Sequence, residues 1–196
     1  MFGEKPSFEY HGAPPPKGLQ KLNIGDSAPN FNLLGVDGKQ YSLEKFDQKK
    51  AIIVVFSCNH CPFVKIYEDR LIAIQKDYAA RGVQLIAINS NDETRYPEES
   101  LKNMIIRAQS KKFNFPYLRD KNQSVAEAYG AERTPEVFLF DNGRILRYHG
   151  RIDDNVEEPH EVRFHYLRDA LDKVLAGKEV STKETAIIGC TIKWKQ

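Results

Sequence analysis

The sequence lacks several features that would quickly assign it to a functional class. Its 196 residues include only three cysteines, two methionines and one tryptophan, and its formal net charge is only +2. A charge so close to zero gives no reason to expect nucleic acid or an anionic membrane surface as a partner. No run of about eighteen apolar residues occurs, so no membrane-spanning helix is expected.

The first residues also lack the apolar core that a secretory signal peptide needs. Residues 1–20 carry scattered charges and three successive prolines, a composition typical of a flexible arm. We therefore expect a cytoplasmic protein. Structural disulfides are rare in that compartment, and an odd number of cysteines argues further against a simple disulfide framework.

What the sequence does contain is the pattern of one α/β domain. A continuously apolar, β-branched run at 51–56 predicts a strand that is buried on both faces, and the mostly apolar run at 83–88 predicts a second buried strand. Between them, apolar residues recur at spacings of three and four over 64–78, which predicts an amphipathic helix. A strand, a helix and a strand in this order make a right-handed βαβ unit.

The rest of the chain continues this α/β pattern. Further helices are predicted at 101–113, 124–131 and 161–180, a strand at 116–120, and a short strand or packed tail at 185–194. Asp37-Gly38 and Asn142-Gly143 each separate two short apolar stretches and predict hairpins, the second through a two-residue turn. The expected organisation is a flexible arm at 1–20, a domain at 21–176 with an N-terminal hairpin and an insertion around 89–117, and a packed tail at 177–196.

Cys58 and Cys61 stand where the buried strand gives way to the predicted helix. Unpaired backbone N–H groups and the helix dipole at a helix start favour a thiolate over a thiol, and the thiolate is the form that attacks disulfides. With two residues between them, the two cysteines can close a disulfide with little movement of the backbone. We expect Cys58 to be the exposed nucleophile and Cys61 to be the resolving thiol.

The neighbours of the pair shape its chemistry. Asn59 and His60 lie between the cysteines, and His60 can carry a positive charge that stabilises a thiolate and makes the pair more oxidising. Pro62 suits the first turn of a helix, where its missing N–H costs nothing. Lys65 and Glu68 lie further along the helix, and we expect both to be solvated surface groups.

A metal site is the first alternative to a redox pair. Zinc prefers four ligands, and only Cys190 remains as a third thiolate, while His60 is locked between the two cysteines. No second cysteine pair completes a zinc signature, so we expect no metal. Cys190 is an auxiliary thiol if the tail folds back near the pair, and otherwise a small buried residue.

Several motifs together resemble the thioredoxin superfamily: a strand, Cys-x-x-Cys-Pro at a helix start, and Thr134-Pro135 before a strand and hairpin. The segment "GDSAPNFNLLGVDGKQYSL" is similar to the opening of the redoxin branch, which includes peroxiredoxins and thiol-disulfide oxidoreductases. "SCNHCP" and "GCTIKW" resemble an uncharacterised, peroxiredoxin-like bacterial subgroup. The resemblance covers about residues 22–176 and implies a thioredoxin-like α/β fold with a central mixed sheet flanked by helices.

The resemblance also implies a mechanism. Pro135 follows a cis peptide bond from Thr134 and lies against the cysteine pair, where this loop offers backbone hydrogen bonds to a partner's extended chain. Cys58 attacks a partner's disulfide and Cys61 resolves the mixed disulfide. The partners are then proteins that carry a dithiol or a disulfide, and no bound cofactor is needed.

Two departures from the family pattern leave alternatives open. Thioredoxins carry a tryptophan before the first cysteine, where this chain has Ser57. Peroxiredoxins carry a threonine three residues before the peroxidatic cysteine, but Val55 and Cys58 occupy the positions three before Cys58 and Cys61. A thiol peroxidase that reduces hydrogen peroxide or alkyl hydroperoxides, with Cys61 as the peroxidatic thiol, is the second hypothesis.

A copper-binding protein of the same fold is a third hypothesis, from another functional class. Copper chaperones of this fold use two cysteines and a distant histidine, because thiolate and imidazole suit copper. The candidates for that histidine are His149, His160 and His165. The chaperones' cysteines, however, are separated by three residues rather than two, so redox chemistry is favoured.

Overall fold

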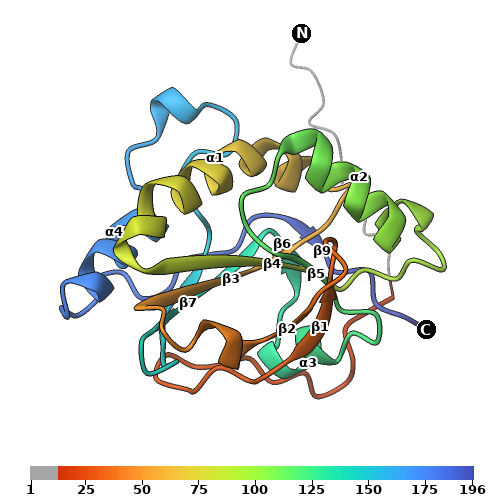
Figure 1. Ribbon diagram of the computed structural model, residues 1–196, viewed down its shortest axis with the longest axis horizontal. Coiled ribbons are helices and arrows are strands. Elements are labelled where there is room, and N and C mark those ends of the chain that lie inside the picture. Colours follow the sequence, from red (N-terminus) through yellow and green to blue (C-terminus); the bar gives the residue numbers. More distant parts are fainter. Residues whose placement is uncertain (1–12) are drawn as a thin grey trace, which may run out of the picture.

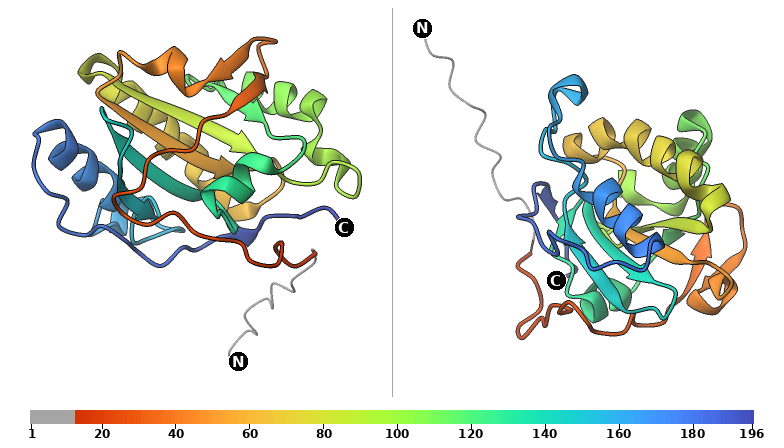
Figure 2. Two further views of the ribbon diagram at one scale, coloured as in Figure 1. Left: turned by 90° about the horizontal axis from the view of Figure 1, so that it is seen from below. Right: turned by 90° about the vertical axis from the view of Figure 1, so that its left-hand side faces the viewer.

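The structure is a computed structural model that describes residues 13–196. Within these residues, a seven-stranded sheet in the order β2-β1-β5-β4-β3-β7-β8 forms the centre, with helices on both of its faces (Figures 1 and 2). The expected mixed sheet flanked by helices is therefore confirmed. Its strands are β1 (Asn32–Gly35), β2 (Gln40–Ser42), β3 (Ala51–Ser57), β4 (Val83–Asn89), β5 (Tyr117–Arg119), β7 (Glu136–Asp141) and β8 (Leu146–Gly150).

The strand β3 lies between β4, to which it is parallel, and β7, to which it is antiparallel. All seven of its residues are buried, and successive side chains enter opposite halves of the core. Ile53 and Val55 pack on the side covered by three helices: α1 (Pro62–Tyr78), α2 (Leu101–Lys111) and α4 (Tyr166–Leu175). Ile52 and Val54 pack on the side covered by α3 (Ser124–Tyr129) and the 3-10 helix η1 (Leu43–Phe46).

The last long helix is shorter than the sequence pattern predicts. A helix is expected over 161–180, but α4 begins at Tyr166 and a separate 3-10 turn, η4 (Pro159–Glu161), precedes it. The backbone N–H groups of Arg163 and Phe164 donate to the carboxylate of Asp154, at 2.9 and 3.1 Å. These amides therefore belong to a loop stabilised by an acidic side chain, and the helix starts only after them.

The two predicted hairpins have different outcomes. β1 and β2 pair antiparallel around Asp37-Gly38, with Gly38 at a φ of +78° as the turn requires. The turn between β7 and β8, however, is wider than the two-residue turn predicted. Arg144, and not Gly143, adopts the left-handed conformation, with a φ of +63°. Its guanidinium donates to the carbonyls of Phe46 and Lys49, and these contacts hold the wider loop.

Both ends of the described chain pack on the domain. Most of the expected flexible arm, residues 1–12, lies outside the described residues, but Ala13 is buried and forms an isolated β-bridge with Trp194. The tail adds the short strand β9 (Cys190–Thr191), which pairs with β6 (Arg133–Thr134) in a second, two-stranded sheet (Figure 1). Between residues 13 and 196, no helix has the length and apolar character needed to cross a bilayer.

Candidate active site

The two cysteines lie at the junction of β3 and α1, as the sequence predicts. Cys58 follows the last residue of β3, and Cys61 is the N-cap residue of α1, with Pro62 at the first helical position. Both are free thiols, but Cys58 is only 2% exposed and Cys61 is fully buried. The expectation that Cys58 is exposed is therefore wrong. The loop with Thr134 and Pro135 and the C-terminal tail pack against the pair and remove it from solvent.

Thr134 contacts both cysteines. Its hydroxyl oxygen lies 3.3 Å from the sulfur of Cys58, and the Cys61 thiol donates to its carbonyl oxygen, also at 3.3 Å. The peptide bond between Thr134 and Pro135 is cis, as the family resemblance implies. Although these residues are more than 70 positions apart along the chain, the fold brings them together.

Glu99 holds the backbone between the cysteines, and the sequence analysis missed it. It belongs to the 3-10 turn η3 (Pro97–Glu99), in the segment expected to be an inserted polar loop, and it is fully buried. Its carboxylate accepts hydrogen bonds from the N–H groups of Asn59 and His60, at 2.9 and 3.1 Å, and from the amide of Asn89 at 2.7 Å. It also contacts Nδ1 of His60. No sequence motif marks this residue.

Asn59 and His60 are fixed by these contacts rather than exposed to solvent. The Asn59 side chain donates to the carbonyl of Glu98 at 2.8 Å and accepts from the hydroxyl of Tyr117 at 3.0 Å. The hydrogen bond to Glu99 raises the pKa of His60 above its usual value. Burial opposes ionisation of Glu99, but hydrogen bonds from His60 and Asn59 outweigh it and lower the pKa of this carboxyl. An ion pair between the partly exposed His60 and the buried Glu99 thus lies beside Cys58.

The three thiols of the chain form one cluster, in which Cys61 is central. Cys190 packs against Cys58, Cys61 and Val64, because β9 pairs with the strand that contains Thr134. Hydrogen bonds from the thiols of Cys190 and Cys58, and from the N–H of Val64, lower the pKa of Cys61. Burial raises the pKa of Cys58 well above its usual value, and contact with Cys61 raises that of Cys190. Of the three thiols, Cys61 is therefore the one whose ionisation is favoured, and on ionising it gives up its hydrogen bond to the Thr134 carbonyl.

The remaining predicted residues lie apart from this cluster or have other roles. Lys65 is exposed, as expected, but Glu68 is buried and receives two hydrogen bonds from Arg107, at 2.7 and 2.6 Å. The expectation that Glu68 is solvated is thus wrong, because α2 packs over this face of α1. His149 contacts Glu136 through Nε2 at 2.8 Å. His160 is exposed in the turn η4.

Metal-ligating side chains gather in a different set from the one predicted. Within residues 13–196, the group of such side chains that lies close together is Cys58, His60 and Glu99, whose ligand atoms are all within 4.8 Å of one another. None of the distant histidines, His165 included, belongs to it. The Glu99 carboxylate already accepts hydrogen bonds from two backbone amides, so it is committed to holding the loop.

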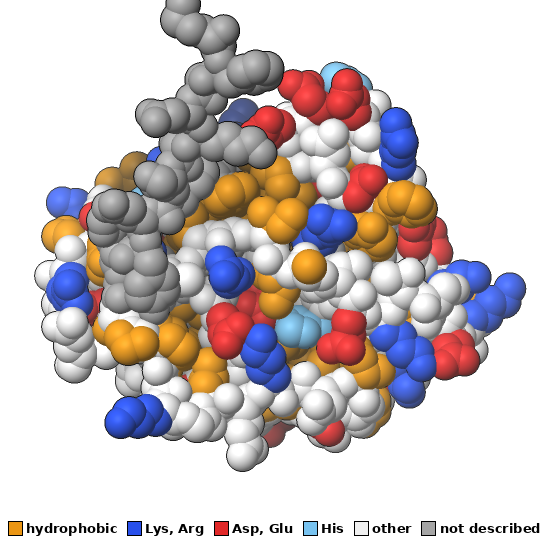
Figure 3. Space-filling view, turned by 180° about the vertical axis from the view of Figure 1, so that it is seen from behind, with side chains coloured by type: hydrophobic (Ala, Val, Ile, Leu, Met, Phe, Trp, Pro, Cys, Tyr) orange, Lys and Arg blue, Asp and Glu red, His pale blue; other side chains and the backbone are white. Residues whose placement is uncertain are grey.

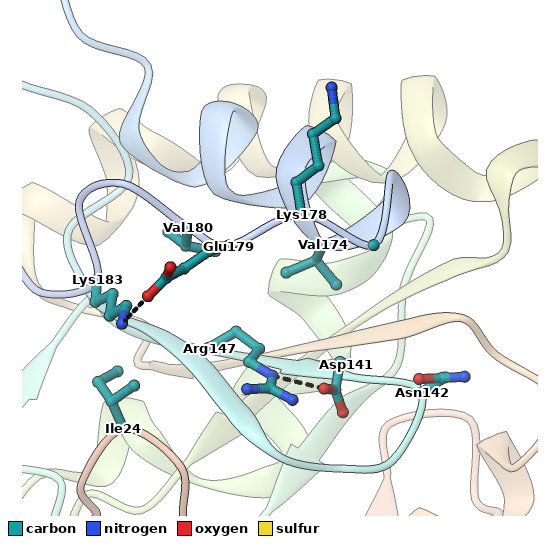
Figure 4. Close-up of a pocket in the computed structure, with 10 residues that line it drawn as sticks. Ile24, Asp141, Asn142, Arg147, Val174, Lys178, Glu179, Val180 and Lys183 are labelled. Atoms are coloured by element: carbon teal, nitrogen blue, oxygen red, sulfur yellow. Dashed lines mark hydrogen bonds and ion pairs between the residues drawn. The ribbon is translucent and has the colours of Figure 1, made fainter.

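The surface formed by residues 13–196 offers no stronger candidate. One face mixes side chains of both charges with hydrophobic ones and has no field of a single sign (Figure 3). A surface cavity of about 380 Å³ is lined by residues that include Ile24, Val174 and Val180 (Figure 4). Four of its charged groups form two ion pairs, Arg147 with Asp141 at 2.6 Å and Lys183 with Glu179 at 2.5 Å. We therefore place the candidate active site at the cysteines.

Comparison with known proteins decides the family. The model of the AhpC/TSA family matches residues 24–149, which is more than half of the chain. The chain belongs to the AhpC/TSA family. The matched part includes Cys58, Cys61, Thr134 and Pro135, but it ends before the tail that carries Cys190.

The chain is also similar to a curated protein and to a solved structure. The thiol-disulfide oxidoreductase ResA of Halalkalibacterium halodurans is 28% identical over 137 residues, which cover 68% of this chain and 73% of that protein. A crystal structure of a hypothetical protein from Sinorhizobium meliloti 1021 is 41% identical, with a TM-score of 0.85, and covers 90% of this chain and 97% of that one.

A more distant solved structure identifies the fold. A thiol:disulfide interchange protein of the thioredoxin family from Chlorobium tepidum has a TM-score of 0.58 at 21% identity, and the match covers 80% of this chain and 97% of that one. At this level of identity the likeness concerns the fold alone. The AhpC/TSA chain therefore has the thioredoxin-like fold that the sequence motifs implied.

Proposed function

We propose that the protein is a thiol-disulfide oxidoreductase whose redox couple is Cys58 and Cys61. One observation carries the proposal: the two cysteines pack together at the start of α1, and Thr134 contacts both of them. The thiol-disulfide oxidoreductases among its curated relatives support the same class of reaction. Its partners would be proteins that carry a dithiol or a disulfide.

The reaction proceeds by two exchange steps. Cys58 loses its proton, and its sulfur attacks one sulfur of the partner's disulfide. A mixed disulfide forms, and the other sulfur of the partner leaves as a thiolate that takes up the proton. The Cys61 thiolate then attacks the Cys58 sulfur, closes the Cys58–Cys61 bond, and releases the partner's second sulfur, so the partner gains two electrons. Run in reverse, the same steps oxidise a partner's dithiol.

The electrostatics of the pair favour the oxidising direction. A low pKa of Cys61 stabilises the reduced protein and makes Cys61 a good leaving group when a partner's thiolate attacks the Cys58 sulfur of the disulfide. Cys58 has the opposite character, because burial keeps it protonated. The proposal retains the cytoplasmic location expected from the sequence, with another dithiol protein as the redox partner.

The test is the reduction potential of the pair. The full chain is equilibrated in glutathione buffers, quenched with acid and alkylated, and the peptide 51–65 is analysed by mass spectrometry. We expect one two-electron transition within peptide 51–65 in the wild type and in Cys190→Ser, between about −200 and −120 mV, and no disulfide within this peptide in Cys58→Ser or Cys61→Ser. If no Cys58–Cys61 disulfide forms at any buffer ratio, the proposed function is wrong.

A thiol peroxidase is the second candidate, and one contact favours it. The Thr134 hydroxyl lies 3.3 Å from the Cys58 sulfur, so a hydroxyl stands beside a thiol even though the threonine of the peroxiredoxin motif is missing. Micromolar hydrogen peroxide separates the two activities. Rapid oxidation that Thr134→Ser retains and Thr134→Val loses would favour the peroxidase, whereas slow oxidation in all three proteins would leave thiol–disulfide exchange.

A further inference from the structure

The C-terminal tail occupies the edge of β6 beside the cysteine pair. β9 pairs antiparallel with β6, and Cys190 stands directly opposite Thr134 in the register. Thr134 is also the residue that contacts Cys58 and Cys61. One short backbone pairing therefore sets the position of the third thiol relative to the other two (Figure 1).

The tail is anchored on the C-terminal side of Cys190. The N–H of Ile192 donates to the carbonyl of Glu132 at 2.9 Å, and the N–H of Lys193 donates to the side chain of Asn91 at 2.8 Å. Trp194 is 4% exposed and packs in the core on the α3 side of the sheet. Such anchors hold Cys190 at one place without a covalent link.

The close approach of the tail to Thr134, just before Cys190, depends on Gly189. A Cβ atom on Gly189 would lie 2.3 Å from the carbonyl oxygen of Thr134, a distance that no side chain can adopt. Upstream of it, residues 181–184 are exposed, and Ile188 has an exposed fraction of 37%. The tail is thus tightly placed at Cys190, and before it the backbone of Lys183 and Thr185 is hydrogen-bonded to that of His149 at 2.9 and 3.1 Å.

Cys61 packs against both of the other cysteines. It receives hydrogen bonds from the thiols of both Cys190 and Cys58, and from the backbone N–H of Cys190. Thiol–disulfide exchange requires an attacking sulfur and a leaving sulfur on opposite sides of the sulfur that is attacked. Cys61 has a sulfur neighbour for each role.

We propose that Cys190 is a third redox thiol, which exchanges with the Cys58–Cys61 disulfide at the sulfur of Cys61. This deepens the proposed function and rests on it, because it starts from the disulfide formed there. The Cys190 thiolate attacks the Cys61 sulfur, the Cys61–Cys190 bond forms, and the Cys58–Cys61 bond breaks. Cys58 leaves with the electron pair and takes up the proton that Cys190 lost, so the step needs no external oxidant.

The exchange has a consequence for the reaction cycle. After the exchange the chain still holds one disulfide, which now joins the tail to α1 through Cys190 and Cys61. Cys58 has returned to the thiol state. A partner whose extended chain pairs with β6 must displace β9 and with it Cys190. The tail therefore competes with the partner both for the backbone edge and for the sulfur of Cys61.

The decisive experiment removes Cys58 and maps the remaining disulfide. Full-length Cys58→Ser is incubated with oxidised glutathione and digested with trypsin, which separates peptide 51–65 from peptide 184–193. We expect a disulfide between these two peptides as the main product. In Cys61→Ser we expect the Cys58–Cys190 link to form at least about tenfold more slowly, because Cys190 faces Cys61.

A matched control separates docking from chance collision. On the Cys58→Ser background, Cys190→Ser with Thr182→Cys moves the thiol to an exposed part of the same tail, and its link to Cys61 should form about tenfold more slowly. Cys58→Ala replaces Cys58→Ser if the serine variant does not fold.

Two results would overturn the proposal, and they are distinguishable. In the first, the wild type forms the Cys58–Cys61 disulfide, but Cys58→Ser gives only glutathionylated Cys61 or forms the Cys61–Cys190 disulfide no faster than the control forms its own. Cys190 is then not a redox thiol, and the proposed function stands. If the wild type also forms no Cys58–Cys61 disulfide, both proposals fail together.

Discussion

Glu99 is the residue on which the segment between the two cysteines depends. Asn59 and His60 each donate a backbone N–H to its carboxylate, and the carboxylate has no exposure to solvent. Replacing a buried acceptor that satisfies two backbone donors and a side-chain amide lowers the free energy of unfolding, because each donor left without a partner costs about 1–3 kcal/mol. Its negative charge also adds to the effect of burial in raising the pKa of Cys58.

We therefore expect Glu99→Gln to affect stability and reactivity together. The free energy of unfolding should fall by about 2–4 kcal/mol, since glutamine keeps the size but offers one acceptor oxygen and an opposed NH2 group. The pKa of Cys58 should fall as well. Urea denaturation measures the first effect, and the pH dependence of alkylation in the Cys61→Ser/Cys190→Ser background measures the second. The exposed neighbour is the control: Glu98→Gln should change neither.

The His60–Glu99 pair predicts a specific dependence of stability on pH. The hydrogen bond to Glu99 raises the pKa of His60, the charge of Glu98 adds to this, and Lys193 opposes it. A raised histidine pKa stabilises the fold fully below the unfolded value of about 6.5, and this stability is lost as the pH rises through the folded value. The lowered pKa of Glu99 contributes stability that is complete above the unfolded value of about 4.3. This contribution is lost as the pH falls through the folded value.

The pair should thus stabilise the protein most between about pH 4.3 and 6.5. We expect the difference in urea midpoint between the wild type and His60→Gln to be constant over the upper part of this window and to shrink at higher pH. His160→Gln, an exposed histidine in η4, should show no such difference. A difference that grows as the pH rises above neutrality would contradict the ion pair.

At the scale of elements, the pairing of β9 with β6 is the feature that closes the site. β9 has two residues, and Gly189 directly before it approaches the Thr134 carbonyl too closely to carry a side chain. A methyl group at this position would push the tail away from β6 without touching either cysteine of the pair. The site should then open.

Gly189→Ala should therefore raise the rate at which iodoacetamide alkylates Cys58 and Cys61 in the reduced protein, by roughly tenfold or more if opening of the tail limits the reaction. Ile188→Ala alters the neighbouring exposed residue and should leave the rate unchanged. Alkylation is followed by mass spectrometry of peptide 51–65. Equal rates in Gly189→Ala and the wild type would show that β9 does not guard the pair.

The elements that the sequence predicted well are those with a strong local pattern. The apolar runs of β3 and β4 and the helical spacing of α1 match the structure because burial on both faces, or along one face, leaves a clear periodicity. The turn between β7 and β8 differed because Arg144 reaches carbonyls on another segment. The start of α4 differed because Asp154 captures the preceding amides. Contacts of this kind leave no periodic signal.

The same limit applies to the candidate site at the scale of the whole molecule. The Cys-x-x-Cys-Pro and Thr-Pro motifs located Cys58, Cys61 and Thr134, because they are local in sequence and typical of a family. Glu99 and the position of Cys190 depend on how distant segments meet over the end of β3, and an acidic residue in a polar loop or a cysteine in an apolar tail has no distinctive pattern. The closed site is thus a property of the assembled fold.

The fold as a whole should also be sensitive to the redox state of the pair. Hydrogen bonds to the Cys61 thiolate lower the pKa of Cys61 and so stabilise the reduced protein. They are lost when Cys61 enters the Cys58–Cys61 disulfide. Each unit by which the pKa is lowered corresponds to about 1.4 kcal/mol. The disulfide closes so short a loop that its entropic benefit is only about 2 kcal/mol. Because the lowered pKa of Cys61 outweighs so small a benefit, the reduced form should be the more stable one.

We expect reduced protein to unfold at a higher urea concentration than oxidised protein, with a gap that depends on pH. The lowered pKa of Cys61 contributes stability that is complete above the unfolded value of about 8.5 and diminishes as the pH falls. Cys58, whose pKa is raised, has the opposite effect above about 8.5, because there it ionises only in the unfolded chain. The gap should thus widen from acidic pH to a maximum near 8.5, as urea midpoints of both forms will show. An oxidised form that is more stable throughout would mean that the pair acts as a reductant.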